Sequence, residues 1–248
     1  MLKVERTGSV LVLELHRPRQ RNAIDTELTH EIDAALALLE RDPQIAAAVV
    51  TGGREVFSAG TDLHEASSPS TPDGGEYGIA RRPRRKPVVA AVEGLALGGG
   101  FEIVLACDLV VAAESARFGL PEVRRGVVAN CGAFFRGPQR LSPTIALEMM
   151  LTGDSVSAAR AYQAGLVNQV VPDGTALDSA LELAERIIRN SPAAIAATLA
   201  GVREAQAESE RAGWAATERA AADAAASPDR AEGIAAFFEK REPRWTRG

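Results

Sequence analysis

The 248-residue chain has only two cysteines and three histidines, and only 4% of its residues are aromatic. Its two cysteines, Cys107 and Cys131, exclude a disulfide framework and favour a reducing compartment. The histidines His16, His30 and His64 are scattered and show no metal-ligand spacing with the cysteines. We therefore predict that the protein has no metal site.

Long apolar runs and a strong excess of one charge are also missing. No hydrophobic stretch reaches the length of a membrane span, and the N-terminal segment lacks a signal-peptide cleavage pattern. A net charge of -5 gives no general attraction to nucleic acid or to an anionic membrane. We expect a soluble cytoplasmic protein that binds neither.

Short apolar strands alternate with helical patterns over most of the chain. Apolar residues recur at helical spacing from Ile24 to Leu39, and Asp25 is placed to cap that helix. Strands are expected over residues 10–15, 46–51, 87–92 and 109–112. The alternation predicts an α/β fold, with only helices from about Ala176 onward. The Ser/Pro/Gly-rich start of segment 65–86 predicts a mobile surface loop.

Three consecutive glycines, Gly98 to Gly100, stand directly before an expected helix. The spacing fits neither a dinucleotide-binding fingerprint nor a phosphate-binding loop. One interpretation is a tight turn with packing glycines. Another is an oxyanion hole, because N–H groups at a helix start are unpaired and the helix dipole favours negative charge there. The turn "FSAGTDL", residues 57–63, is a candidate for the second donor.

Several long motifs together resemble the enoyl-CoA hydratase/isomerase family, the crotonase superfamily. They are "FSAGTDL", "KPVVAAVEGLALGGGFEIVLACDLVVAAESARFGLPE" and the terminal "FFEKREPRW", with "RPRQRNAID" and "AYQAGLVNQVVP" in support. The resemblance implies a crotonase-like (ClpP/crotonase) α/β spiral of ββα units with a C-terminal helical trimerisation region. It implies a core with an acyl-CoA site over residues 1–190, an oligomerisation region over 191–248, and a homotrimer or hexamer.

The resemblance also implies an acyl-CoA site and its residues. The oxyanion hole would be formed by the N–H groups of Ala59 and Gly99, which would hold the thioester carbonyl. No separate cofactor is implied, because coenzyme A is part of the substrate. Further substrate-binding residues implied in this way are Ser58, Gly60, Asp62, Leu63, Gly98, Asn130 and Lys240.

Two glutamates, Glu102 after the glycines and Glu122 in "FGLPEV", are the candidate catalytic groups. Adding water to a double bond needs a base for the water and an acid for the carbon. Two close carboxyl groups can share these roles if one stays protonated. The family resemblance implies that Glu102 activates the water and Glu122 protonates the α-carbon. The sequence itself does not assign the two roles.

The segment after Glu122 departs from the usual hydratase pattern. Ala129-Asn130 replaces a Pro-Gly pair, and we expect Asn130 to cap the following helix rather than to contact substrate. Phe134 and Phe135 are expected in the core rather than in an acyl pocket. The basic cluster at 81–86 is interpreted first as a solvated loop, second as a dock for the phosphates of coenzyme A.

The motifs therefore predict an enoyl-CoA hydratase, a hydro-lyase that forms 3-hydroxyacyl-CoA from a 2-enoyl-CoA. Two alternatives stay open. One keeps the fold and changes the reaction, to an enoyl-CoA isomerase or another conversion through an enolate. The other is a non-catalytic acyl-CoA-binding protein, which would not require both carboxylates. A serine hydrolase is excluded because no Gly-x-Ser-x-Gly motif is present.

Overall fold

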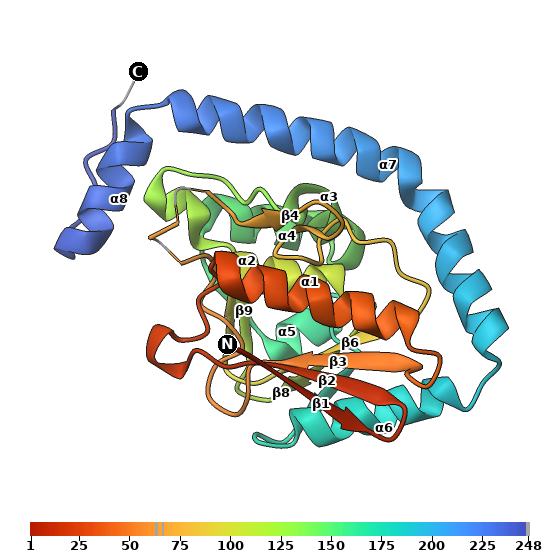
Figure 1. Cartoon of the computed structure of the whole chain (residues 1–248). Helices are drawn as coiled ribbons and strands as arrows, with labels where there is room; N and C mark the ends of the chain where they lie inside the picture. Colours follow the sequence, from red (N-terminus) through yellow and green to blue (C-terminus); the bar gives the residue numbers. More distant parts are fainter. Residues whose placement is uncertain (63, 66, 247–248) are drawn as a thin grey trace.

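A six-stranded sheet forms the base of the molecule. The computed structural model describes residues 1–62, 64–65 and 67–246. The strand order is β1-β2-β3-β6-β8-β11, with β1 and β2 antiparallel and every other neighbouring pair parallel (Figure 1). The strands of this sheet are β1 (Leu2–Thr7), β2 (Val10–Leu15), β3 (Ala47–Thr51), β6 (Val88–Val92), β8 (Leu109–Ala113) and β11 (Gln169–Val171).

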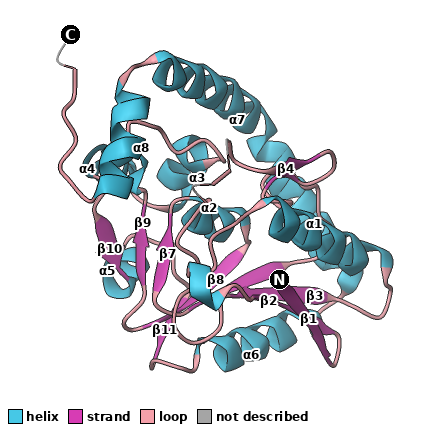
Figure 2. Ribbon diagram, turned by 60° about the vertical axis from the view of Figure 1, so that its left-hand side comes forward, coloured by secondary structure: helices cyan, strands magenta, loops and turns pink. Residues whose placement is uncertain are grey.

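Both faces of the central strands β3, β6 and β8 are buried, which explains why these strands are almost entirely apolar. Val49 and Val111 pack on one face, together with Ala180 of helix α6 (Ala176–Ile188). Val50 and Val92 belong to the main core on the other face. Figure 2 shows α6 on one side of the sheet and most other helices on the opposite side. The predicted α/β class is therefore confirmed.

A second, smaller sheet stands beside the first and leads into the glycine triplet. Its order is β10-β9-β7, and a separate pair, β4-β5, lies near the long N-terminal helix (Figure 2). The short strand β7 runs directly into helix α2 (Gly99–Ala106), so Gly98 is the turn between them. These strands are β7 (Leu95–Leu97), β9 (Arg117–Gly119), β10 (Ser155–Ser157), β4 (Ser70–Thr71) and β5 (Gly75–Glu76).

Helices cover the sheets, and the last two extend along the molecule. Helix α7 runs over 35 residues and arches across the top of the view in Figure 1, and α8 then turns back. No helix in the described ranges has the length and apolar character needed to cross a bilayer. The helices are α1 (Thr26–Arg41), α2 (Gly99–Ala106), α3 (Ala133–Arg140), α4 (Pro143–Thr152), α5 (Ala158–Gln163), α6 (Ala176–Ile188), α7 (Pro192–Ala226) and α8 (Asp229–Glu239), with 3-10 turns η1 (Pro18–Gln20) and η2 (Pro121–Arg125).

Local capping signals are found where the sequence predicts them. The side chain of Asp25 accepts a 2.9 Å hydrogen bond from the N–H of Leu28 at the start of α1. Ser191 caps α7 in the same way, and only helices follow residue 176. Helix α7 begins at Pro192, and the division of the chain near residue 190 stays a prediction.

The prediction of a surface loop over residues 65–86 is wrong for the described residues from 70 to 80. Tyr77 and Ile79 are buried in the main core, and the strands β4 and β5 pair within the segment. Thr71 donates a 2.9 Å hydrogen bond to Asp33 of α1, which holds the segment against that helix. Two core side chains thus pack a segment of otherwise polar composition against the main core.

The basic cluster at 81–86 is solvated only in part, since Arg81 and Arg85 are exposed whereas three other cations are paired. Arg84 is buried and pairs with Asp108 at 2.8 Å, and Arg82 pairs with Asp33. The ammonium group of Lys86 donates to the carbonyl of Leu39 at 2.6 Å. These three cations link separate segments of the chain, because each contacts an acid or a helix-end carbonyl that is distant in the sequence.

Candidate active site

Each glycine of the triplet leaves space for a different neighbour. A side chain on Gly98 would place its Cβ 3.0 Å from Oε1 of Glu122, and Gly98 itself has φ +53°. A Cβ on Gly99 would lie 2.5 Å from Cζ of Tyr77, and one on Gly100 would lie 2.6 Å from Cβ of Ser58. The packing interpretation is therefore correct for Gly100. The space left by the missing side chain borders the carboxylate of Glu122 at Gly98 and the hydroxyl of Tyr77 at Gly99.

The second glycine turn lies directly against the first. Gly60 has φ +100°, and a Cβ there would approach the backbone N of Gly99 to 3.4 Å. The turn is fixed by Ser58, whose hydroxyl donates to the carbonyl of Asn22 at 2.7 Å and accepts from the N–H of Gly60 at 3.1 Å. The two turns predicted to form an oxyanion hole are thus neighbours.

The predicted donor on this second turn needs a correction. The N–H of Ala59 donates a 3.0 Å hydrogen bond to the carbonyl of Arg21, so it is already paired. The N–H of Thr61 has no acceptor among the described residues, and Thr61 borders the same cavity as Gly99. Within this arrangement Thr61 and Gly99 are the pair of backbone donors that a ligand can use.

Glu122 lies in the first turn of η2, beside Gly98. Pro121 starts that turn and fixes its direction. The Oε2 atom of Glu122 is buried and has no hydrogen-bond partner among the described residues. Burial raises the pKa of Glu122 to about 7, against the opposing charge of Arg125. Such a carboxyl is ready to exchange a proton near neutral pH.

Glu102 lies one turn into α2 and is almost completely buried. Its Oε1 atom accepts hydrogen bonds from the N–H groups of Cys131 and Ala133, at 2.7 and 3.1 Å. Ala133 is the first residue of α3 and Cys131 precedes its N-cap, so Glu102 ties the start of that helix to α2. Burial and the charge of Glu122 raise the pKa of Glu102 to about 8, although the two backbone hydrogen bonds oppose the shift.

Most of the predicted site residues border one cavity of about 430 Å³. Glu102 and Ser58 are buried and are not among the residues that line this cavity. Lys240 ends α8 and is exposed, away from the cavity lining. Leu63 lies outside the described residues. The predicted residues that line the cavity are Ala59, Gly60, Asp62, Gly98, Gly99, Glu122 and Asn130.

Asn130 does not cap α3, contrary to the prediction. The N-cap residue of α3 is Gly132. The backbone N–H groups near this helix start donate to the carboxylate of Glu102. The side-chain oxygen of Asn130 instead accepts a 3.0 Å hydrogen bond from Ser68 at the cavity wall. Phe135 packs edge-on against Trp214 of α7 with ring centroids 5.1 Å apart, so its expected packing role is confirmed.

Tyr77 is the main site residue that sequence reasoning missed. Its hydroxyl contacts the hydroxyl of Thr61 at 2.7 Å, and Tyr77 borders the cavity next to Gly99. Burial raises the pKa of Tyr77 well above its usual range, so the phenol stays neutral. An aromatic residue within the Gly-rich stretch "GGEYG" is the one sequence signal that could have identified it.

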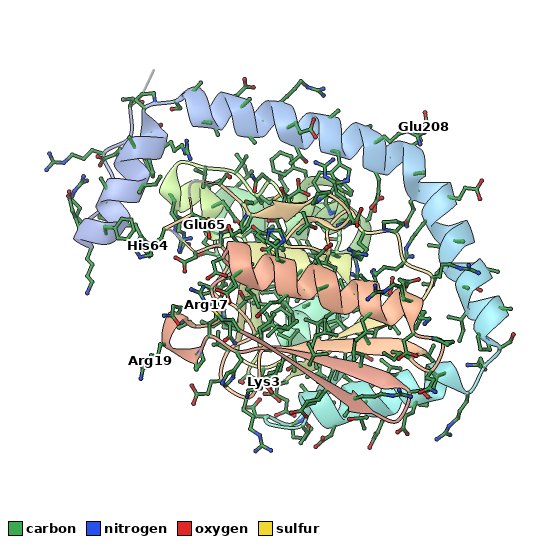
Figure 3. All side chains as sticks on the ribbon, viewed as in Figure 1. Lys3, Arg17, Arg19, His64, Glu65 and Glu208 are labelled. Atoms are coloured by element: carbon green, nitrogen blue, oxygen red, sulfur yellow. The ribbon has the colours of Figure 1, made fainter. Side chains whose placement is uncertain are left out.

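The loop after Thr61 and helix α8 meet at the edge of the cavity. Asp62 pairs with Arg17 at 3.0 Å; although burial opposes it, the His64 N–H and this guanidinium lower the pKa of Asp62. The ring centroids of His64 and Phe238 of α8 are 6.3 Å apart. Figure 3 shows His64 and Glu65 beside α8, with Arg17 below them. The C-terminal helix thus reaches the cavity of its own chain.

The arrangement of the site agrees with the family that the motifs indicated. The family model for enoyl-CoA hydratase/isomerase matches residues 5–248. The chain belongs to the enoyl-CoA hydratase/isomerase family. Within this family, it is 39% identical to 2,3-dehydroadipyl-CoA hydratase of Escherichia coli, over 98% of this chain and 97% of that protein. It is 40% identical to mevalonyl-coenzyme A hydratase of Aspergillus fumigatus, over 96% and 92% of the two chains.

Solved structures of the enoyl-CoA hydratase/isomerase family also match the fold. The structure of carnitinyl-CoA hydratase from Mycobacterium avium is 41% identical, with a TM-score of 0.91 over 99% of this chain and 98% of that one. The predicted crotonase-type fold with a helical C-terminal region is confirmed by this similarity. Within the described residues, no three His, Cys, Asp or Glu side chains are grouped so that they could hold a metal ion.

Proposed function

We propose that this protein hydrates a 2-enoyl-CoA reversibly and forms a 3-hydroxyacyl-CoA, with Glu102 and Glu122 as the acid-base pair. The activity is that of a hydro-lyase, the reaction class named for several of its relatives. The observation that carries the proposal is the pair of glutamates with raised pKa values beside two unpaired backbone donors. Binding of an acyl-CoA without reaction would not require either carboxyl group.

The backbone donors hold the thioester in this mechanism. The N–H groups of Thr61 and Gly99 would bind the carbonyl oxygen, where negative charge develops as water adds to the conjugated bond. Gly99 stands at the first position of α2, so the helix dipole contributes at the same point. No side chain at Gly98 or Gly99 separates the thioester from the backbone.

The two glutamates move the protons. Oε1 of Glu102 is occupied by the start of α3, which leaves Oε2 to take a proton from the attacking water. Glu122 has a buried oxygen without a partner, which suits a carboxylic acid that delivers a proton to the α-carbon. Between about pH 7 and pH 8 the pair holds one shared proton, and the form that adds water is the one in which this proton resides on Glu122.

We propose that no cofactor or metal takes part, because proton transfers and carbonyl polarisation are the only chemistry required. A homotrimer or hexamer is also proposed. Exposed apolar side chains on α4, α7 and α8, among them Leu151, Val202 and Phe238, support it. Light scattering should give a mass three or six times that of the chain, and a monomer would contradict the proposal. The cytoplasmic location stays a prediction from the cysteine content.

A panel of 2-enoyl-CoA esters of different length and branching tests the reaction. The purified protein should deplete the absorbance of the conjugated thioester for at least one ester, without added metal. Double-bond migration as the only reaction would contradict hydration and favour the isomerase. Activity that disappears with a chelator and returns with a metal would contradict the metal-free mechanism.

A further inference from the structure

Arg125 differs from the other arginines of the protein interior, and the proposed mechanism does not use it. It lies at the end of η2 and borders the active-site cavity. No oxygen of the described residues accepts a hydrogen bond from its guanidinium group. Other partly or fully buried arginines are paired with acids or carbonyls, as seen for Arg17, Arg82, Arg84, Arg136 and Arg140.

The position of Arg125 is nevertheless fixed. Its guanidinium carbon lies 4.6 Å from the centroid of the Phe237 ring on α8. Gly233 of α8 rests on the Arg125 backbone, where a Cβ on Gly233 would come within 2.8 Å of Cα of Arg125. Contact with an aromatic ring fixes the orientation of a guanidinium group but does not neutralise its charge. The side chain is therefore oriented, and its donors remain available.

The charge of Arg125 has little compensation in the protein. Burial lowers the pKa of Arg125, and Glu122 is the acid that opposes this shift. Burial, however, raises the pKa of Glu122 to about 7, so that acid is partly neutral at physiological pH. A partly buried guanidinium that lacks a carboxylate is costly unless a ligand supplies one.

Arg125 and Glu122 lie in the same 3-10 turn and line the same cavity. Residues i and i+3 of a 3-10 turn lie one above the other, so Arg125 projects on the same side as Glu122. An acyl chain whose reacting carbons meet Glu122 would therefore continue toward Arg125. The phosphates of coenzyme A are separated from the thioester by the whole pantetheine arm, which makes them the less suitable anion for this residue.

We propose that Arg125 binds a carboxylate at the far end of the acyl chain, so that the preferred substrate is a 2-enoyl-CoA ester bearing a second, free carboxylate. This inference rests on the proposed hydratase function and specifies its substrate class. The planar guanidinium suits two parallel hydrogen bonds to a carboxylate. It would also disfavour acyl chains that end in a cation.

Two esters of equal chain length test the inference: a six-carbon 2-enoyl-CoA with a terminal methyl group, and the same ester with a terminal carboxylate. The wild-type protein should prefer the carboxylated ester in kcat/KM. Arg125→Gln should lower kcat/KM for that ester about 10- to 100-fold, the range for a lost hydrogen bond to a charged group. The loss for the uncharged ester should be much smaller, because it reflects only the missing charge beside Glu122, and Arg125→Lys should recover part of the loss for the carboxylated ester.

Arg124 provides the matched control. It is exposed, pairs with Asp154 and does not border the cavity, so Arg124→Gln should leave both esters unchanged. An equal loss for both esters in Arg125→Gln would overturn the inference, because it would place Arg125 on coenzyme A or on Glu122. The absence of any preference in the wild-type protein would overturn it as well.

The saturated analogues of both esters separate binding from turnover, because they cannot be hydrated. Calorimetry should show tighter binding of the carboxylated analogue, with the difference lost in Arg125→Gln. Hydration of neither unsaturated ester would contradict the proposed function alone, provided that this binding preference is observed. Equal affinity for both analogues would overturn the inference, whatever the activity.

Discussion

Glu102 accepts a 2.7 Å hydrogen bond from the N–H of Cys131, and this contact joins a catalytic candidate to the start of α3. The same oxygen accepts from Ala133. Glu102 therefore has a structural role in addition to its proposed chemical one, and two substitutions should separate the two roles.

Glu102→Gln keeps a side-chain oxygen for both N–H groups but cannot act as a base. We expect a normally folded protein with kcat lowered by roughly 10²-fold or more, the typical scale for a lost acid or base. Glu102→Ala should in addition lose about 1–3 kcal/mol of stability for each unpaired donor. Turnover and denaturant unfolding measured on both variants check this, and a wild-type rate in Glu102→Gln would contradict the proposed role.

The dependence of hydration on pH should be a narrow bell. The reaction needs one protonated and one ionised carboxyl, and burial places the pKa values near 7 for Glu122 and near 8 for Glu102. The profile of kcat/KM should rise through about pH 7 and fall through about pH 8, and both limbs belong to the pair. In Glu122→Gln the pH profile should keep only one limb. This limb should lie at lower pH than in the wild type, because the charge that raises the pKa of Glu102 is removed.

Stability should fall as the pH rises. Both glutamates have higher pKa values in the folded protein than the ordinary value of 4.5, so the folded state binds extra protons above that pH. Their contribution is complete below about pH 4.5 and is lost as the pH rises through 7 to 8. The double variant Glu102→Gln/Glu122→Gln should therefore exceed the wild type in Tm by a margin that grows from pH 5 to 9. A constant margin would show that the carboxyls are not desolvated.

Gly99→Ala should damage the site through Tyr77. The new methyl group would lie 2.5 Å from Cζ of that ring, so the ring or the glycine turn must shift. Loss of one oxyanion donor typically lowers kcat by about 10²–10³-fold. Gly201→Ala is the matched control: this glycine is in α7 with no neighbour near its Cβ, and the exchange should stabilise the helix by up to about 1 kcal/mol with unchanged kcat. Equal kcat in both variants would contradict the role of Gly99.

The features that sequence reasoning found are local ones. The cap from Asp25 to Leu28 spans three residues, and the buried strands are visible as short apolar runs. The glutamates came from long family motifs rather than from periodicity. What was missed depends on contacts between distant residues: Arg84 meets Asp108, and Tyr77 fills the space left by Gly99. Ala59 was misassigned because a motif does not show that its N–H is already bonded to Arg21.

Hydration in water enriched in oxygen-18 tests the central claim most directly. The purified protein is incubated with a 2-enoyl-CoA in the labelled water, and the product is analysed by mass spectrometry. A base that activates free water at Glu102, with proton delivery from Glu122, predicts a 3-hydroxyacyl-CoA that carries the heavy oxygen at the β-carbon. Both Gln variants should form it much more slowly. An unlabelled, rearranged 3-enoyl-CoA as the sole product would contradict the account.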